Sequence, residues 1–346
     1  MAITYISPEK AVAQLKDTPL LDVRTPAEFE EAHIPGAHNL PLFSNEERAE
    51  VGTRYKQVSP KQAFLKGLEF VGPKMRHLVE QAGKIAPGGK VQLHCWRGGQ
   101  RSSSVGWLLD LSGFEVEVIK GGYKAYRTWV QASLTQVKAN FLIVGGPTGA
   151  GKTEVIHALK AAGEQIIDLE KLAHHKGSTF GALGEAPQPT VRQFENDLWE
   201  AYRQLDPDRR IWLENESRAI GRVYIPEGFW KTMTKAPLFD LQVSHEDRLN
   251  RLVQQYASFS DAQLAEAFGR IRKRLGGQHL KAALESLENK DYHKAAEIAL
   301  VYYDKAYHHH TFEKVGRQTV YPVPVEKDDP VQTARTLIAF ANQKQY

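Results

Sequence analysis

The 346-residue chain contains one cysteine, and its neighbours are residues suited to chemistry. Cys95 follows the apolar run 91–93 and precedes a helical pattern over 102–109, which predicts a strand, a tight loop and a helix. Backbone N–H groups of such a loop, together with the helix N-terminus, stabilise an anion at the sulfur. Arg97 and Arg101 add positive charge. The stretch therefore predicts a reactive thiolate.

The alternative interpretation is that Cys95 is a small buried hydrophobe, which is the commonest fate of a free cysteine. Two arginines, two glycines and a histidine surround it in the sequence. This composition is not typical of an apolar core, so we favour the functional interpretation.

A second stretch has the pattern of a phosphate-binding loop. The apolar run 141–144 leads directly into the residues GGPTGAGKT, and 154–162 has helical spacing. This is a P-loop signature in its required strand–loop–helix context. Loop N–H groups would hold phosphate oxygens, the lysine would neutralise them, and the threonine hydroxyl would reach Mg²⁺. The predicted diphosphate-binding residues are Gly146, Gly149, Gly151, Lys152 and Thr153.

Acidic residues end two further predicted strands. Asp168 ends the strand at 165–168, and Glu214 and Glu216 end the strand that begins at residue 211. Ligands bind at the carboxyl ends of strands in parallel α/β sheets. We expect one of these carboxylates to act as a general acid or base or to hold Mg²⁺, the alternative being a solvated strand end.

Two groups of basic residues are candidates for binding a diphosphate or RNA phosphates. Arg218 and Arg222 are four residues apart and would share one face if this segment is helical. A denser cluster follows an amphipathic pattern and contains Arg270, Arg272, Lys273 and Arg274. The alternative for both groups is a solvated surface.

Strands alternate with helices along the whole chain. The first part has expected strands at 20–24, 91–93 and 114–119, and a helix-start signature in which Thr25 is followed by Pro26 and Glu28. This order predicts an α/β domain with a mostly parallel sheet. A boundary over 131–139 then separates residues 1–132 from a second α/β domain of P-loop type, 139–346, with a helical C-terminal region.

Composition narrows the class of protein. Apolar content of 42% and charged content of 25% are those of a soluble globular chain. One cysteine excludes an internal disulfide and a multi-cysteine zinc site and suits a reducing cytoplasm. We find no signal-peptide pattern and no apolar run of membrane-spanning length, so we expect a cytoplasmic protein without membrane contact. His174 and His175 have no further nearby ligand, so no metal centre is predicted.

The segments LLDVRTPAEFEEAHIPGAHNLP, HCWRGGQRS and GGYKAYRTW resemble those of rhodanese domains, over residues 5–130. The resemblance implies that Cys95 carries sulfur or selenium. Small sulfurtransferases commonly have six-residue loops, whereas five residues separate Cys95 from Arg101, as in cysteine phosphatases of the same fold. A loop of this size could hold a tetrahedral phosphate-like group. Ester hydrolysis and chalcogen capture from a phosphate-bearing donor both stay open, although no general acid is evident in the loop.

The later segments GGPTGAGKT, DLEKLAHHKGSTFG, ENESRAIGRVYIP and YYDKAYHHH extend the likeness. The whole order resembles the tRNA 2-selenouridine synthase family. The resemblance implies that selenium from selenophosphate replaces the sulfur of 2-thiouridine at the tRNA wobble position, through an S-geranyl intermediate made from geranyl diphosphate. It also implies a perselenide on Cys95, selenophosphate bound by Arg97 and Arg101, and a departing pyrophosphate stabilised by Lys152. The P-loop resembles that of tRNA dimethylallyltransferases as well.

The partners that this resemblance implies are tRNA, geranyl diphosphate and selenophosphate, with the synthase of selenophosphate as a candidate protein partner and Mg²⁺ as a candidate cofactor. Three alternatives stay open. One is a tRNA sulfurtransferase whose P-loop holds ATP, and another is a phosphatase fused to a kinase-like module. The third is an RNA-binding regulator with a vestigial loop, which the intact Cys95 and Lys152 disfavour.

Overall fold

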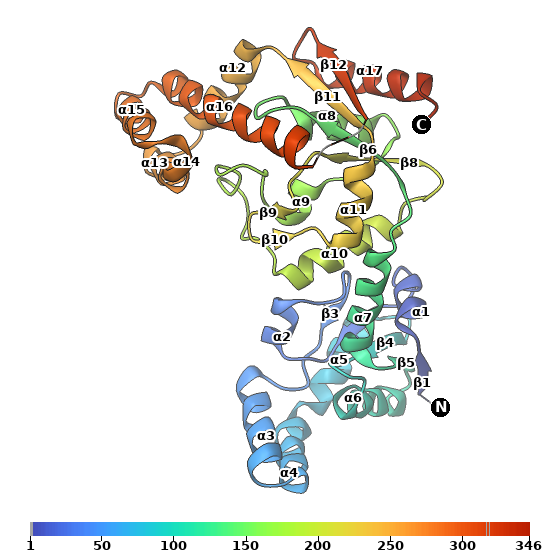
Figure 1. Ribbon diagram of the computed structural model, residues 1–346. Helices are drawn as coiled ribbons and strands as arrows, with labels where there is room; N and C mark the ends of the chain where they lie inside the picture. The colour runs from blue at the N-terminus through green and yellow to red at the C-terminus, as the bar shows by residue number, and fades with distance from the viewer. Residues whose placement is uncertain (1–2, 316, 318) are drawn as a thin grey trace. The chain divides into compact units, whose positions relative to one another are not determined.

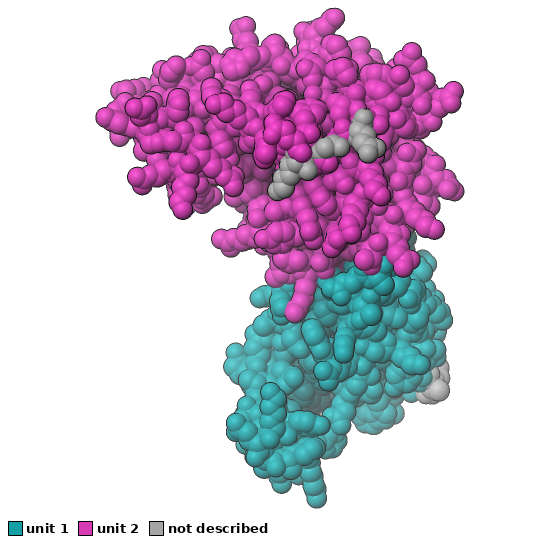
Figure 2. Space-filling model, viewed as in Figure 1, with its two compact units in different colours: residues 1–133 teal, residues 134–346 magenta. Residues whose placement is uncertain are grey.

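The computed structural model describes residues 3–315, 317 and 319–346. The chain divides into two compact units, residues 1–133 and 134–346 (Figure 2). Each unit contains its own five-stranded sheet, and every strand pair in these two sheets is parallel. The predicted fold class, a rhodanese-like α/β domain followed by a P-loop α/β domain, is confirmed in both halves (Figure 1).

The first unit has the strand order β1-β5-β4-β2-β3. These strands are β1 (Thr4–Ile6), β2 (Leu20–Asp22), β3 (His38–Asn39), β4 (Lys90–His94) and β5 (Glu115–Ile119). Between these strands in the chain lie α1 (Pro8–Ala13), α2 (Pro26–Glu31), α5 (Met75–Ile85) and α6 (Gln100–Leu111), and α7 (Gly122–Thr135) follows the last strand, β5. A packed pair that the sequence analysis did not predict, α3 (Asn45–Gln57) and α4 (Pro60–Val71), lies between β3 and α5.

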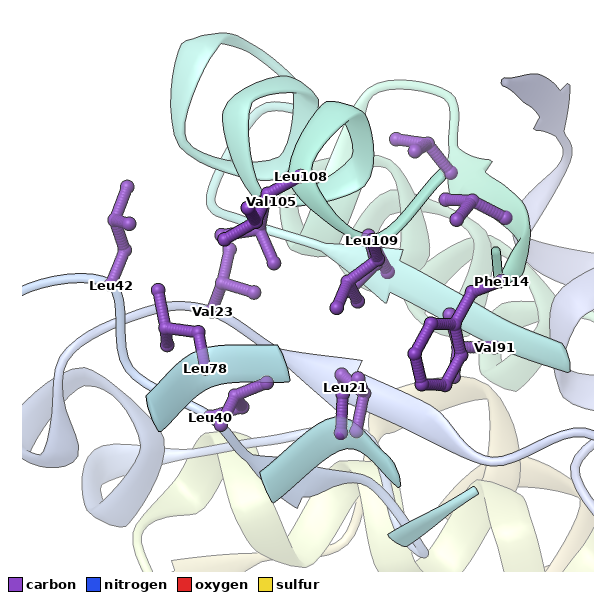
Figure 3. Close-up of a cluster of buried hydrophobic side chains, with 14 of the residues drawn as sticks. Leu21, Val23, Leu40, Leu42, Leu78, Val91, Val105, Leu108, Leu109 and Phe114 are labelled. Atoms are coloured by element: carbon purple, nitrogen blue, oxygen red, sulfur yellow. The ribbon is translucent and has the colours of Figure 1, made fainter. Parts of the chain in front are cut away.

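The apolar core of this unit lies between the sheet and its helices (Figure 3). Leu21 and Val91 come from neighbouring strands, and Val105 and Leu109 come from α6; all four are fully buried. Full burial of such a side chain contributes on the order of 2 kcal/mol. Cys95 sits at the edge of this core, one residue beyond β4.

The predicted start of α2 is confirmed. The Thr25 side chain accepts a hydrogen bond from the N–H of Glu28, and the Glu28 carboxylate accepts one from the N–H of Thr25 at 3.0 Å. This capping box satisfies two of the N–H groups that a helix leaves free at its start. It also fixes Glu28, which has a second partner described below.

The loop after Cys95 packs directly against the start of α7. The carbonyl oxygens of Cys95 and Trp96 accept hydrogen bonds of 2.9 Å from the N–H groups of Tyr123 and Lys124. Gly98 and Gly122 both have a positive φ, and a Cβ on Gly122 would fall on the Cys95 carbonyl oxygen. Only glycine permits this close backbone contact.

The second unit has the strand order β12-β11-β6-β8-β7. These strands are β6 (Asn140–Gly145), β7 (Gln165–Ile167), β8 (Arg210–Glu214), β11 (Leu238–Val243) and β12 (Val320–Val325). The helices nearest the sheet are α8 (Lys152–Ala161), α9 (Leu169–Ala173), α10 (Val191–Arg203), α11 (Glu227–Lys235) and α17 (Pro330–Gln343).

Five further helices form a group that we call the helical lobe (Figure 1). They are α12 (His245–Ala257), α13 (Asp261–Arg270), α14 (Arg272–Leu275), α15 (Gly277–Glu288) and α16 (Tyr292–His308). They have a core of their own, which includes Tyr256, Phe268 and Tyr303. A π-helical turn, His309–Lys314, continues α16.

The segment that contains Arg218 and Arg222 is not helical, so the two arginines do not share a helical face. Instead β9 (Ala219–Ile220) and β10 (Val223–Tyr224) form an antiparallel hairpin around Gly221. Gly221 has a positive φ, which ends any helix and suits a tight turn. In the described part of the chain no helix is both long enough and apolar enough to cross a bilayer.

We expect Gly122→Ala to destabilise the first unit by about 2–4 kcal/mol, because its Cβ would displace the Cys95 loop as well as strain the backbone. Gly113→Ala is the matched control, since Gly113 also has a positive φ but open space around it. The control should lose only about 1 kcal/mol. Urea unfolding of the full chain measures both, and equal losses would show that the loop contact contributes nothing.

Candidate active sites in the cysteine loop and the P-loop

The Cys95 loop connects the end of β4 to the start of α6. Cys95 is only 4% exposed, yet its sulfur has polar neighbours. The Ser102 hydroxyl lies 3.3 Å from Sγ and the Gly99 carbonyl oxygen lies 3.9 Å from it. The site is thus both buried, as the apolar interpretation expected, and polar at the sulfur, as the functional interpretation expected.

These neighbours determine the pKa of the thiol. Burial alone would raise the pKa of Cys95, but hydrogen bonds from Ser102 and from the Arg97 N–H, together with the charge of Arg101, outweigh burial and lower the pKa below its ordinary value. A lower pKa increases the thiolate fraction at neutral pH, and the thiolate is the nucleophile.

The two arginines of the loop differ in their contacts. Arg101 donates two hydrogen bonds to the Glu28 carboxylate, at 2.5 and 3.1 Å. Burial tends to raise the pKa of Glu28, but this pairing with Arg101 lowers it overall. The Arg97 side chain is exposed, and among the described residues it has no hydrogen-bond or ion-pair partner; its N–H is the group that reaches the sulfur. Sequence reasoning assigned Glu28 only to the helix cap.

A buried ion pair supports the loop from beneath. Arg24 donates from Nε to both Asp22 oxygens, at 2.9 and 3.0 Å, and its guanidinium lies 4.0 Å from the centre of the Tyr123 ring. His94 Nε2 lies 3.5 Å from the same carboxylate. Burial lowers the pKa of His94, which therefore stays neutral at physiological pH. The sequence analysis identified the motifs that contain Asp22, Arg24 and Tyr123. It did not predict that Arg24 contacts the other two residues.

The P-loop follows β6 and ends in α8, as predicted. Its three predicted glycines, Gly146, Gly149 and Gly151, all have a positive φ. Lys152 Nζ lies over the loop and donates to the Gly146 carbonyl at 2.9 Å. The Thr153 hydroxyl donates to a Glu170 oxygen at 2.7 Å.

Two arginines of α12 hold the P-loop from the side of the helical lobe. Arg248 Nε donates to the Thr148 carbonyl at 2.9 Å, and Arg251 donates to the Gly149 carbonyl at 2.8 Å. These bonds fix the conformation of the loop, in which the Ala150 N–H donates to the Pro147 carbonyl at 3.0 Å. Sequence reasoning missed both arginines, because they are about 100 residues from the loop and carry no motif.

Tyr307 also reaches the P-loop, from the end of α16. Its hydroxyl accepts from the Gly146 N–H at 2.8 Å and donates to Asp240. Burial and the Asp240 charge raise the pKa of Tyr307, so the phenol keeps its proton. The sequence analysis included this tyrosine only as part of the segment YYDKAYHHH in the family resemblance.

The acidic residues occupy different positions around the P-loop. Glu170 and Glu216 share a hydrogen bond, and burial beside Glu170 raises the pKa of Glu216 to about 8. Burial raises the pKa of Glu214 as well, and Glu214 accepts from the Leu169 N–H at 3.1 Å. Asp168 is the N-cap of α9 and lies 2.7 Å from His157. Glu216 therefore faces the site, together with Glu170, while Asp168 and Glu214 support α9.

A cavity of about 1180 Å³ opens at the P-loop, entirely within the second unit. Its polar end contains the P-loop, Glu170, Glu216 and Arg251. The rest of its wall is mixed: polar side chains such as Lys176, His279 and Lys305 alternate with an apolar part, which comes from the loop before α10 and from the helical lobe. The apolar and aromatic lining residues include Phe180, Leu183, Leu252, Tyr256, Phe259, Leu275, Ile298 and Tyr302.

The predicted basic residues divide between this cavity and the outer surface. Arg274 lines the cavity and donates to the Tyr302 hydroxyl at 3.2 Å. Arg270 forms an exposed ion pair with Glu266, and Arg272 and Lys273 are exposed on α14. Arg218 and Arg222 are exposed on the β9–β10 hairpin, outside the cavity.

Comparison with known proteins identifies both units. Residues 7–128 match the rhodanese-like domain, and residues 139–323 match the AAA domain of tRNA 2-selenouridine synthase. The chain belongs to the tRNA 2-selenouridine synthase family. A synthase of this name from Shewanella denitrificans is 35% identical over 347 residues, which cover 90% of this chain and 93% of that protein. Those from Hydrogenovibrio crunogenus and a Sulfurovum species are 36% and 35% identical, over 82% and 80% of this chain and 84% and 80% of their own lengths.

We expect Ser102→Ala to raise the pKa of Cys95 by about 1 unit, because it removes a hydrogen bond to the thiolate. Cys95 is the only cysteine, so the pH dependence of iodoacetamide alkylation reports on this thiol alone. Ser104→Ala, an exposed position on the same helix, is the control and should leave the profile unchanged. An unchanged profile in Ser102→Ala would contradict the assignment.

We also expect Glu216→Gln to change how stability depends on pH. The pKa of Glu216 is about 8 in the folded chain against an ordinary value of 4.5, so the folded form loses stability as pH rises between these values. The variant stays neutral and avoids this loss. Its melting temperature should exceed that of the parent at pH of about 8.5 and approach it at pH of about 5. Glu227→Gln, an exposed position, should follow the parent.

Proposed function

We propose that this protein replaces the sulfur of 2-thiouridine at the tRNA wobble position by selenium, with selenophosphate as the donor and an S-geranyl nucleoside as the intermediate. The observation that carries the proposal is that the family likeness extends over both units. The lowered pKa of Cys95 and the position of Lys152 over the P-loop support it. One chain thus has a thiolate loop for a selenium donor and a P-loop for a diphosphate.

The P-loop is assigned to the alkylation step. A lone pair of the thiouridine sulfur attacks C1 of geranyl diphosphate, the C1–O bond breaks with its electron pair on the diphosphate, and the N3 proton of the base passes to water. Lys152 and the loop N–H groups are placed to stabilise the charge that develops on the leaving diphosphate. Such preorganised donors typically contribute about 10²–10³-fold to a rate.

Thr153 and Glu170 would hold Mg²⁺ together with diphosphate oxygens. Their oxygen atoms lie 2.7 Å apart beside the loop, and Mg²⁺ in such sites prefers a few hard oxygen ligands plus phosphates and water. The described residues contain no group of three or more His, Cys, Asp or Glu side chains arranged for a metal. The ion, when bound, would neutralise further charge on the diphosphate.

The apolar wall of the cavity favours a prenyl donor over a nucleotide. Leu252 and Tyr256 lie one helical turn apart on α12, directly after Arg251, which contacts the P-loop. Phe180 packs against Tyr256 with ring centroids 5.0 Å apart. A chain attached to a diphosphate in the P-loop would follow this wall, and aromatic faces stabilise a developing allylic cation.

Alkylation solves a leaving-group problem for the selenation step. A thiocarbonyl sulfur departs poorly, whereas a geranylthiolate can leave when selenium attacks C2. The Cys95 loop is assigned to the activation of selenophosphate. For the RNA itself we propose contact with Arg274 and Tyr302 at the cavity and with the exposed Arg270, Arg272 and Lys273.

The experiment is mass spectrometry of an anticodon stem-loop that contains 2-thiouridine. The full-length protein is incubated with geranyl diphosphate, with selenophosphate, or with both. Geranyl addition should need Lys152 and survive Cys95→Ser, while selenium exchange should need both residues. Lys152→Ala should slow geranyl addition by more than about 100-fold. Lys160→Ala, an exposed lysine on the same helix, is the control.

Other outcomes would favour other functions. Competition between ATP and geranyl diphosphate, with sulfur transfer but no geranyl product, would support an ATP-dependent sulfurtransferase. Release of phosphate from esters without any change in the RNA would support a phosphatase–kinase fusion. Either result would overturn the proposal.

A further inference from the structure

If the proposed function holds, the oxidation level of selenium restricts how it can pass from selenophosphate to the RNA. Selenium has the same oxidation level in selenophosphate and in a selenocarbonyl. A perselenide on Cys95 would require the removal of two electrons from thiolate and selenium and their later return. The chain has no second cysteine that could take part in such an exchange. A route without oxidation therefore fits this chain better.

The loop has the spacing and the donors for attack at phosphorus. Five residues separate Cys95 from Arg101, which is the spacing of loops that hold a tetrahedral phosphate around a cysteine. Arg101 has five N–H groups, of which Glu28 uses two, so the others are available for phosphoryl oxygens. Glu28 thus orients the Arg101 guanidinium and leaves some of its N–H groups available for a ligand.

The protonation states of the two carboxylates beside the Cys95 loop determine which leaving groups the site can release. Asp22 and Glu28 are both paired, with Arg24 and Arg101, and the pKa of each is lowered despite its burial. Neither can donate a proton at neutral pH, although an alkoxide leaving group would need one. Selenium leaves as the hydrogenselenide ion, HSe⁻, which is stable at neutral pH. Its proton comes from the protonated selenophosphate itself, so no proton donor in the loop is needed. The same loop that is poorly equipped for ester hydrolysis is thus well equipped to release selenide.

We propose that Cys95 is a phosphoryl acceptor: its thiolate attacks the phosphorus of selenophosphate and expels hydrogen selenide. The Sγ–P bond forms, the P–Se bond breaks, and selenium leaves with the electron pair. Hydrogen selenide then attacks C2 of the S-geranyl nucleoside, and geranylthiolate departs. Water attacks the phosphocysteine, which gives inorganic phosphate and restores the thiolate. No step changes an oxidation level.

Ser102 has a defined part in the last step. Its hydroxyl lies 3.3 Å from Sγ and donates to the Gly99 carbonyl at 3.1 Å; a rotation of the hydroxyl lets it donate instead to the thiolate that departs from phosphorus. Loss of this donor should slow hydrolysis of the phosphocysteine more than its formation. Ser102 is therefore the residue whose replacement should let the intermediate accumulate.

The test is acid quenching of the full-length protein after it is mixed with selenophosphate, followed by intact-mass and peptide mass spectrometry. Because Cys95 is the only cysteine, any adduct on a thiol is assigned without ambiguity. We expect a phosphoryl group on Cys95, more of it in Ser102→Ala, and selenide release that Arg101→Ala slows by about 100-fold or more. Ser104→Ala should behave as the parent does, and Arg101→Lys should retain part of the rate.

Three results would overturn the inference: a selenium mass on Cys95, undiminished selenide release by Cys95→Ser, or Cys95-dependent selenation of RNA with no phosphoryl adduct in Ser102→Ala. The RNA product is measured in the same samples. Selenouridine formed without the adduct removes this mechanism and leaves the proposed function. The opposite outcome is an adduct on Cys95 while the RNA stays unchanged in the presence of geranyl diphosphate. That result would overturn the proposed function and support the phosphoryl transfer.

Discussion

The packing of one backbone segment against another shapes the cysteine site. The carbonyls of Cys95 and Trp96 face the start of α7, where two N–H groups bind them, so the Arg97 N–H can turn toward the sulfur. This contact depends on glycine at 98 and 122, because a side chain at either place would enter the opposing backbone. The hydrogen bonds of Ser102 lower the pKa of the thiol most, and the further contribution of the Arg97 N–H depends on glycine in both of these segments.

The P-loop is held in a different way. Its carbonyl oxygens are engaged by Arg248 and Arg251, long side chains from α12, and Tyr307 contacts its first glycine. Beneath it, Glu170 and Glu216 share a hydrogen bond in a buried setting that favours a neutral acid. A cation at Lys152 and an acid that resists ionisation make this site receptive to an anion.

The sequence predicted the parallel sheets, the cap of α2 and the positions of both loops, since these depend on local pattern and spacing. It did not predict the roles of Glu28, Arg248 or Arg251, because each acts on a loop distant in the chain and belongs to no motif. Arg218 and Arg222 were misplaced because a spacing of four indicates a shared face only within a helix. The α3–α4 pair had no distinctive signature. Local sequence patterns do not predict contacts between charged side chains that are far apart in the chain.

The two arginines of α12 also link the helical lobe to the state of the P-loop. Arg248 bonds Asp304 of α16 as well as the loop, and Arg251 bonds Asp328, which follows β12. These contacts connect the P-loop to α16 and to the segment after β12. If a ligand orders the loop through them, thermodynamic reciprocity requires that ordering of the lobe raise the affinity of the loop for its anion by the same factor. If RNA binds the exposed basic residues of α13 and α14, RNA and the diphosphate in the P-loop would then bind cooperatively.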